Sequence, residues 1–495
     1  MAVGVRRAFA LLTALTSLTA ACSGSSGVRT LDATAPSSSQ VPGTDPPPST
    51  SSPSAPSGGG LGDSLFPLLG NPGIDVEHYD LHLDYDPSTE VLEATATLEI
   101  ALTDHRDDIG LDAVGLDLER VAVDGHDVDV VAEPDKVLIP LPEGTASDGA
   151  VTVVIDYRVD VEARESDVGL PVGWFTTEGG SYVLNEPDGA RTWMPCNDHP
   201  SDKATYDITI SVPSGGTGVA NGTLVSRATS GGDESWHWRE STPMATYLVL
   251  VATGDYELVE GIGPNGLPLT SAVLRSDLST MQPFLDTIDD QIAWFEQWFG
   301  PYPLDGYGIA MTDGPGGLAM ETQGRSLFSR DDFMSGELYE TTELLLSHEL
   351  VHQWFGDAVS PARWSDIWLN ESFATYGEWM WLDHVGIQSL DAQAETSLRV
   401  RPQGSPADPP VDEMFGFNSY SGGAVVLHAL RLTVGDDVFF DILREWVQRN
   451  VGTSRTTDDF IAMAESVSGR PLDEFFDTWL FAVSAPVAYP VTVGV

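Results

Sequence analysis

The chain has 495 residues, which is long enough for two or three domains with substantial hydrophobic cores. Its 75 acidic and 23 basic residues give a formal charge of -52, which argues against nucleic acids and anionic lipid surfaces as partners. Only two cysteines are present, Cys22 and Cys196, so at most one disulfide can form, and none is available if Cys22 is modified.

The first 22 residues have the pattern of an export signal. Arg6 and Arg7 precede an apolar run at residues 8–21 that is too short to span a bilayer, and Cys22 follows two small residues. This pattern resembles a bacterial lipoprotein signal peptide. We therefore expect an exported protein that is anchored to the extracytoplasmic face of the cell membrane only through a lipid on Cys22. Plain secretion is the alternative, because Thr19 stands where an aliphatic residue is commoner.

The rest of the chain divides into three regions by composition and periodicity. Residues 23–62 are rich in Ser, Pro and Gly, and they predict a disordered tether. An all-β domain is predicted at 63–256, because period-two alternation recurs at residues 79–86, 94–102, 151–159 and 204–213. A mainly helical α+β domain is predicted at 257–495, where helical runs such as 281–300 and 423–447 alternate with short strands.

The stretch "SHELVHQWFGD" at residues 347–357 places two histidines and a glutamate on an otherwise apolar helix. At about 100° per residue, His348 and His352 project from the same helix face one turn apart, close enough to share one small ion. Two imidazoles leave room for a third protein ligand and a water molecule on a zinc ion. Glu349 points away from the two imidazoles and can reach that water, so we predict that it is the general base.

The third ligand is predicted in the segment "WSDIWLNESFATYGEWMWLDHVG", a second helix for which Ser365 or Asp366 is the expected N-cap. Glu371 lies in this helix, and 18 residues separate it from His352, which suits a second helix that crosses beside the first. We therefore predict one zinc ion per chain, bound by His348, His352 and Glu371. The alternative interpretation is that these are hydrogen-bonded core residues.

These motifs and their order resemble the aminopeptidase N family of gluzincin metallopeptidases. Besides the zinc signature, three segments are similar to landmarks of that family: "ARTWMPCNDHPSDKATYDITISVP", "GGLAMET" and "YSGGAVVLHALR". The resemblance implies a saddle-shaped β domain followed by a thermolysin-like catalytic domain, with the large helical C-terminal domain of longer members missing. It also implies hydrolysis of the N-terminal residue from peptides that have a free N-terminus.

The resemblance assigns two further kinds of site residue. Tyr420 matches the family tyrosine that donates a hydrogen bond to the developing oxyanion, and the nearby Tyr376 is a rival for that role. Glu321 and Glu186 match two carboxylates that bind the α-amine of the peptide.

The segment around Glu321 is also expected to bind the peptide backbone. Family resemblance implies that Gly317, Leu318 and Ala319 pair with the extended substrate as an added strand. Thr322 replaces the asparagine expected after Glu321, and Leu318 and Ala319 replace smaller residues, so the resemblance does not extend to the shape of the substrate pocket. A zinc endopeptidase or an epoxide hydrolase of the same family, or a catalytically silent surface binding protein, remain as alternative functions.

Overall fold

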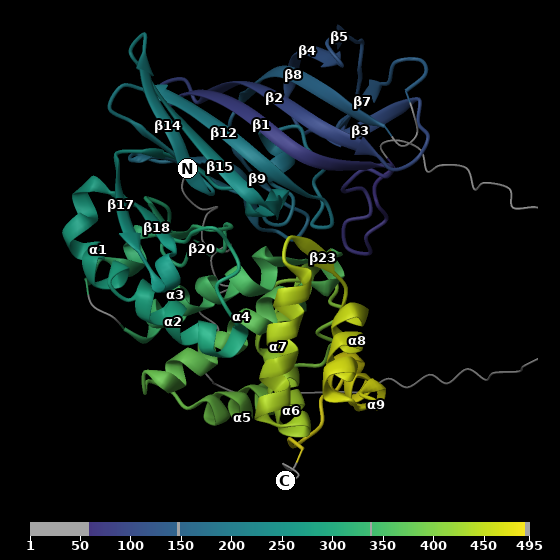
Figure 1. Cartoon of the computed structure of the whole chain (residues 1–495), viewed down its shortest axis with the longest axis vertical. Coiled ribbons are helices and arrows are strands. Elements are labelled where there is room, and N and C mark those ends of the chain that lie inside the picture. Colours follow the sequence, from purple (N-terminus) through teal and green to yellow (C-terminus); the bar gives the residue numbers. More distant parts are fainter. Residues whose placement is uncertain (1–58, 146–148, 337–338, 491–495) are drawn as a thin grey trace, which may run out of the picture. The chain divides into compact units, whose positions relative to one another are not determined.

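The structure is a computed structural model that describes residues 59–145, 149–336 and 339–490. The predicted export signal, the lipidation site at Cys22 and all but the last few residues of the predicted tether at 23–62 lie outside the described residues. The described chain begins with a β-rich part and continues into a mainly helical part (Figure 1).

The β-rich part is dominated by one sheet of eight strands, in the order β14-β15-β12-β1-β2-β8-β4-β5 (Figure 1). Neighbouring strands are antiparallel except for β1 and β12, which are parallel. The four segments predicted from period-two alternation form β1, β2, β8 and β12 of this sheet. Its strands are β1 (Ile74–Asp86), β2 (Val91–Leu102), β4 (Asp117–Val123), β5 (His126–Asp127), β8 (Ala150–Asp160), β12 (Lys203–Pro213), β14 (Thr223–Ser230) and β15 (Asp233–Ala245).

Two smaller sheets complete this part. One has the order β3-β7-β6 and the other the order β13-β16-β11-β10-β9. Inward-facing side chains such as Leu81, Leu98, Ile155 and Ile208 come from alternate positions of the large sheet and are buried in one apolar core. The strands of the smaller sheets are β3 (Asp108–Asp112), β6 (Val131–Ala132), β7 (Lys136–Pro140), β9 (Ala163–Glu165), β10 (Pro171–Thr176), β11 (Gly180–Leu184), β13 (Thr217–Ala220) and β16 (Val251–Gly254).

The second part begins with a five-stranded sheet in the order β17-β18-β19-β21-β20, so β20 lies at its edge. Helices follow and enclose a second apolar core. The sheet strands are β17 (Tyr256–Ile262), β18 (Pro268–Leu274), β19 (Ile309–Thr312), β20 (Ala319–Met320) and β21 (Ser326–Ser329), and a separate pair is β22 (Val359–Pro361) and β23 (Thr453–Arg455). The helices are α1 (Leu278–Leu285), α2 (Ile288–Phe299), α3 (Glu340–His352), α4 (Trp368–His384), α5 (Leu390–Val400), α6 (Gly423–Val434), α7 (Asp436–Asn450), α8 (Thr457–Ser468) and α9 (Asp473–Phe476).

Three segments with wider, π-type turns interrupt or extend these helices: η6 (Gln353–Asp357), whose backbone leaves the helical region at Phe355 and Gly356, η9 (Asn418–Gly422) and η10 (Asp477–Phe481). Such turns are frequent at functional sites. The run predicted at 423–447 is divided into α6 and α7 at Gly435, whose φ of 89° lies in the left-handed region that favours glycine.

The predicted N-cap of the helix that carries Glu371 is wrong. Ser365 and Asp366 lie in a preceding one-turn helix, and Ile367 occupies the N-cap of α4 without a side-chain hydrogen bond. The carboxylate of Asp366 is used elsewhere, because its Oδ1 accepts hydrogen bonds from the backbone N–H and the hydroxyl of Thr457 at the start of α8.

The predicted fold class is confirmed: a β-rich N-terminal part is followed by a mainly helical α+β part. Cys196 is buried and makes no disulfide with any described residue. No helix in the described ranges combines the length and the apolar composition that crossing a membrane requires.

Candidate metal centre

Two neighbouring helices bring the three predicted ligands together. His348 and His352 lie in the last turns of α3, and Glu371 lies in the first turn of α4. The Oε2 atom of Glu371 is 3.4 Å from Nε2 of His348 and 3.5 Å from Nε2 of His352. Ligand atoms placed tetrahedrally at 2.0–2.1 Å from a zinc ion are about 3.4 Å apart. The two distances from Glu371 therefore match a zinc site, and all three ligand atoms lie within 4.8 Å of one another.

The other ring nitrogen of each histidine is already bonded to protein. Nδ1 of His352 donates to the carbonyl of Phe355 at 3.2 Å, and Nδ1 of His348 is 3.2 Å from Oε2 of Glu378. These bonds leave both Nε2 atoms for the metal. Sequence reasoning missed Glu378. It lies seven residues after Glu371 on α4, which is two turns along the same helix face, and this spacing could have identified it.

The charges around the three ligands also fit a cation. Burial opposes the charged form of the His348 imidazole, but hydrogen bonds with Glu371 and Glu378 outweigh it and raise the pKa of His348 well above its ordinary value. Burial likewise opposes ionisation of Glu371, and the hydrogen bonds with both histidines reverse this and lower its pKa to about 2. A zinc ion would take the place of the protons that these pairings retain.

Glu349 lies beside the ligands and is only 4% exposed. Its Oε2 atom is buried without a hydrogen-bond partner in the described chain. Burial raises the pKa of Glu349 to about 8, against the opposing charges of His348 and His352. A carboxylate with a raised pKa is suited to accept a proton near neutral pH.

Tyr420 lies in η9 with its ring against His348, at a centroid separation of 6.0 Å and an interplanar angle of 15°. Burial, together with the charges of Glu371 and Glu186, raises its pKa well above 10, so its hydroxyl stays protonated and can donate. The rival Tyr376 lies elsewhere, with its hydroxyl 3.3 Å from Nδ1 of His428 inside the helical core.

A cluster of carboxylates adjoins the metal ligands. Ligand atoms of Glu186, Glu321 and Glu371 all lie within 4.8 Å of one another, although Glu186 comes from the β-rich part. Oε1 of Glu186 and Oε1 of Glu321 are buried without a hydrogen-bond donor among the described residues. Burial and mutual repulsion raise the pKa of Glu186 well above its usual range. This arrangement would be stabilised by a cationic group placed between the carboxylates.

The loop that carries Glu321 is held against α3 by Gln353, a second residue that sequence reasoning missed. Its Nε2 donates to the carbonyl of Glu321 at 3.2 Å, and its Oε1 accepts from the N–H of Gly324 at 2.7 Å. Thr322, which replaces the expected asparagine, donates its hydroxyl to the carbonyl of Arg325 and so stabilises the same turn.

The strand β20 has one open edge beside this cluster, because it pairs only with β21. The three residues predicted to bind the peptide backbone differ in which of their own backbone N–H and carbonyl groups are free to bind a peptide. The N–H of Gly317 donates to Asp332 at 2.7 Å, and the carbonyl of Leu318 accepts from Ser329. In an antiparallel pair the backbone groups of alternate residues point to opposite edges, so those of Ala319 face the open side.

Comparisons with known proteins agree with this geometry. Residues 75–248 match the peptidase M1 N-terminal domain, and residues 284–479 match the peptidase family M1 domain. A two-domain M1 zinc metallopeptidase, a mutant bound to L-arginine, is 30% identical with a TM-score of 0.80, and the match covers 88% of this chain and 100% of that one. A mutant M1 zinc metallopeptidase from Deinococcus radiodurans bound to a Tyr-Ser-Ala substrate is 28% identical with a TM-score of 0.77 and the same coverage.

The curated relatives are longer proteins. "Probable aminopeptidase 2" of Sulfurisphaera tokodaii is 25% identical over 441 residues, which are 84% of this chain and 54% of that protein. The matches cover from 36% to 55% of the length of these curated relatives.

Proposed function

This chain belongs to peptidase family M1, and from that membership we propose that it is a zinc-dependent aminopeptidase that removes the N-terminal residue from peptides. One observation carries the proposal. The carboxylates of Glu186 and Glu321 meet Glu371 beside the zinc-type ligand set, and no described residue donates a hydrogen bond to the buried Oε1 atom of Glu186 or of Glu321. The positively charged α-amine of a peptide is a group that such carboxylates can bind.

The chemistry follows from the side chains around this point. His348, His352 and Glu371 would hold the zinc ion, which when bound supplies a polarised water of lowered pKa. Glu349 accepts a proton from the attacking water and returns it to the leaving amine. Tyr420, whose hydroxyl stays protonated, donates a hydrogen bond to the oxygen on which negative charge develops.

The same arrangement explains why cleavage would occur after the first residue. Ala319 on the open edge of β20 can hold the peptide backbone as an added strand. Glu321 and Glu186 then close the site at the amine end, so a longer N-terminal extension would meet the buried Oε1 atoms of these carboxylates. The structures of homologues with bound L-arginine and Tyr-Ser-Ala support a peptide substrate for this chain. An endopeptidase, an epoxide hydrolase or a silent binding protein does not require a carboxylate pair that binds a free α-amine, so the pair favours an aminopeptidase.

The test compares one peptide with a free amine and the same peptide with an acetylated amine. We expect the parent to cleave the free peptide and to cleave the acetylated one poorly. Glu321→Ala should lose about 2 to 4 kcal/mol of transition-state stabilisation toward the free peptide, because the buried ammonium loses its partner. Zinc content, measured by elemental analysis, should stay at one per chain. Glu340→Ala, an exposed glutamate at the start of α3, is the control and should behave as the parent.

Equal cleavage of both peptides by the parent, or an unchanged ratio of the free-peptide rate to the acetylated-peptide rate in Glu321→Ala, would point to the endopeptidase alternative.

For the cellular location we propose export with a lipid anchor on Cys22. The sequence pattern of residues 1–22 supports this location, and simple secretion is the alternative.

A further inference from the structure

Arg401, the residue that follows α5, binds three separate segments with one side chain. Its Nε donates to Oδ1 of Asn418 at 3.2 Å, and its Nη1 donates to the carbonyl of Trp479 at 3.1 Å. Its Nη2 reaches the carbonyl of Gly404 at 3.4 Å. A single guanidinium therefore connects the end of α5 to η9 and to η10.

The segment η9 is the turn that carries Tyr420, and Asn418 is its first residue. The amide of Asn418 is held at both ends, because its Nδ2 also donates to the carbonyl of Gln403 at 3.4 Å. On the other side of the turn, the hydroxyl of Ser372 donates to the carbonyl of Ser419 at 2.6 Å. Ser372 follows the ligand Glu371, so the turn is fixed between the metal-ligand helix and Arg401.

Two glycines show how closely the backbone packs around Asn418. At Gly404, which has a φ of 139°, an added Cβ would lie 2.6 Å from Nδ2 of Asn418. At Gly422 an added Cβ would lie 2.7 Å from Oδ1 of the same residue. Both distances are too short for a side chain, so the amide of Asn418 has little room to shift and its bond to Arg401 has a defined direction.

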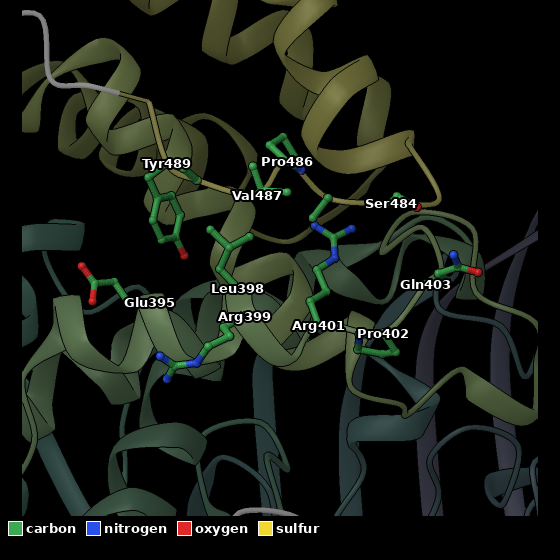
Figure 2. A pocket seen from close by; sticks show the side chains of 12 residues that line it. Glu395, Leu398, Arg399, Arg401, Pro402, Gln403, Ser484, Pro486, Val487 and Tyr489 are labelled. Carbon is green, nitrogen blue, oxygen red and sulfur yellow. The ribbon is translucent and has the colours of Figure 1, made fainter. Parts of the chain in front are cut away.

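Arg401 also borders a cavity of about 620 Å³ between α5 and residues 484–489. Figure 2 shows its side chain extending toward Ser484 and Pro486, whereas Arg399 points away from Arg401. Burial lowers the pKa of Arg401 to about 10, so it keeps its charge at neutral pH. Within the part of the chain that the structure describes, no carboxylate lies within 4.0 Å of it. Its partners are neutral oxygens, which indicates a role in geometry rather than in charge pairing.

We propose that Arg401 is a positioning residue that holds η9 so that the hydroxyl of Tyr420 meets the developing oxyanion. This inference rests on the proposed function, because only a reaction at the metal centre gives Tyr420 that task. Arg401 touches no substrate in this scheme and acts through Asn418. A misplacement of about 1 Å at a catalytic group can cost roughly 100-fold in rate.

The first experiment compares Arg401→Ala and Arg401→Lys with Arg399→Ala. Arg399 is exposed and lines the same cavity, but its guanidinium donates to Thr396 on its own helix. Both Arg401 variants should lower kcat by about 10- to 100-fold with little change in KM, because the amine and backbone contacts are untouched. Lysine fails because a single ammonium cannot reach three acceptors in a planar fork. Arg399→Ala should match the parent. Zinc content and melting temperature confirm that each variant is folded.

The second experiment repeats the Arg401→Ala substitution in a Tyr420→Phe background. If Arg401 acts through Tyr420, Arg401→Ala should lower kcat only slightly in the Tyr420→Phe background, because the hydroxyl that Arg401 positions is already absent. Asn418→Ala, which removes the same hydrogen bond from its other end, should reproduce the kcat loss and provides the test if Arg401→Ala does not fold. Millimolar guanidinium, which can enter the cavity, should partly restore Arg401→Ala and leave Arg399→Ala unchanged.

The outcomes separate this inference from the proposed function. An equal loss of kcat in the parent and Tyr420→Phe backgrounds, or equal behaviour of the Arg401 and Arg399 variants, overturns the role of Arg401 while the peptidase activity stands. A parent protein that cleaves no free-amine peptide contradicts the proposed function itself.

Discussion

At the scale of single residues, Glu349 separates metal binding from catalysis. Its side chain lies beside the ligands but is not one of the predicted set His348, His352 and Glu371, and its buried Oε2 has no hydrogen-bond partner among the described residues. Glu349→Gln should therefore keep one zinc per chain while lowering kcat by several orders of magnitude, because the proton acceptor is lost. Elemental analysis and peptide hydrolysis by the same preparation provide the measurement. A variant that retains full activity would remove Glu349 from the mechanism.

Residues whose roles depend on local spacing could be predicted from the sequence, and the others could not. His348 and His352 share a helix face four positions apart, and the structure brings their Nε2 atoms to Glu371. Gln353 and Arg401 bind backbone carbonyls and amides of loops that are distant in the sequence, and sequence periodicity does not predict such contacts. The availability of Ala319, in contrast to the bonded N–H of Gly317, depends on strand pairing and needed the structure.

At the scale of elements, the start of β12 gives a prediction about pH. Asp202 precedes this strand, and its carboxylate accepts from the amide of Asn197 and from the N–H of Val76. Burial raises the pKa of Asp202 to about 8. Because the folded chain binds this proton more tightly than the unfolded chain, the stabilisation is fully present below about pH 4 and is lost as the pH rises to about 8.

The loss amounts to at most about 1.4 kcal/mol per pH unit. We therefore expect the melting temperature of the parent to fall more between pH 5 and pH 8.5 than that of Asp202→Asn, which carries no titrating group there. Asp207→Asn on the same strand is the control. Burial raises the pKa of Asp207, but its bonds with Arg239 and His237 outweigh this and lower it, so that variant should not gain in relative stability at high pH. If the melting temperatures of the parent and Asp202→Asn change in parallel with pH, the prediction is refuted.

Some strands and helices can be predicted from the sequence more readily than others. Strands with one buried face, such as β1 and β2, follow the period-two pattern closely. The parallel pairing of β1 with β12 joins residues more than 120 positions apart, and their sequences do not specify it. The turn η9 is also absent from the pattern, because its wide helical geometry depends on Ser372, Arg401 and the glycines around Asn418.

At the scale of the whole molecule, the β-rich and helical parts share the site and exchange contacts. Glu186 comes from the first part and meets Glu321 of the second. Lys203, one of the two lysines in the chain, donates to the carbonyl of Asp357 at 2.6 Å and joins β12 to the end of η6. The site that we propose therefore needs both parts, and separating them would remove one of the two amine-binding carboxylates.

The lipid anchor that we propose at Cys22 gives a prediction about the location of the protein. If Cys22 carries a lipid, Cys22→Ala should move the protein from the membrane fraction to the medium or leave it unprocessed, because the substitution removes the site of the lipid. Cys196→Ala is the matched control, since that thiol is buried in the β-rich core and should not affect fractionation. Mass spectrometry of the mature N-terminal peptide identifies the modification. An unmodified N-terminus elsewhere in the chain would replace the lipid anchor with simple secretion.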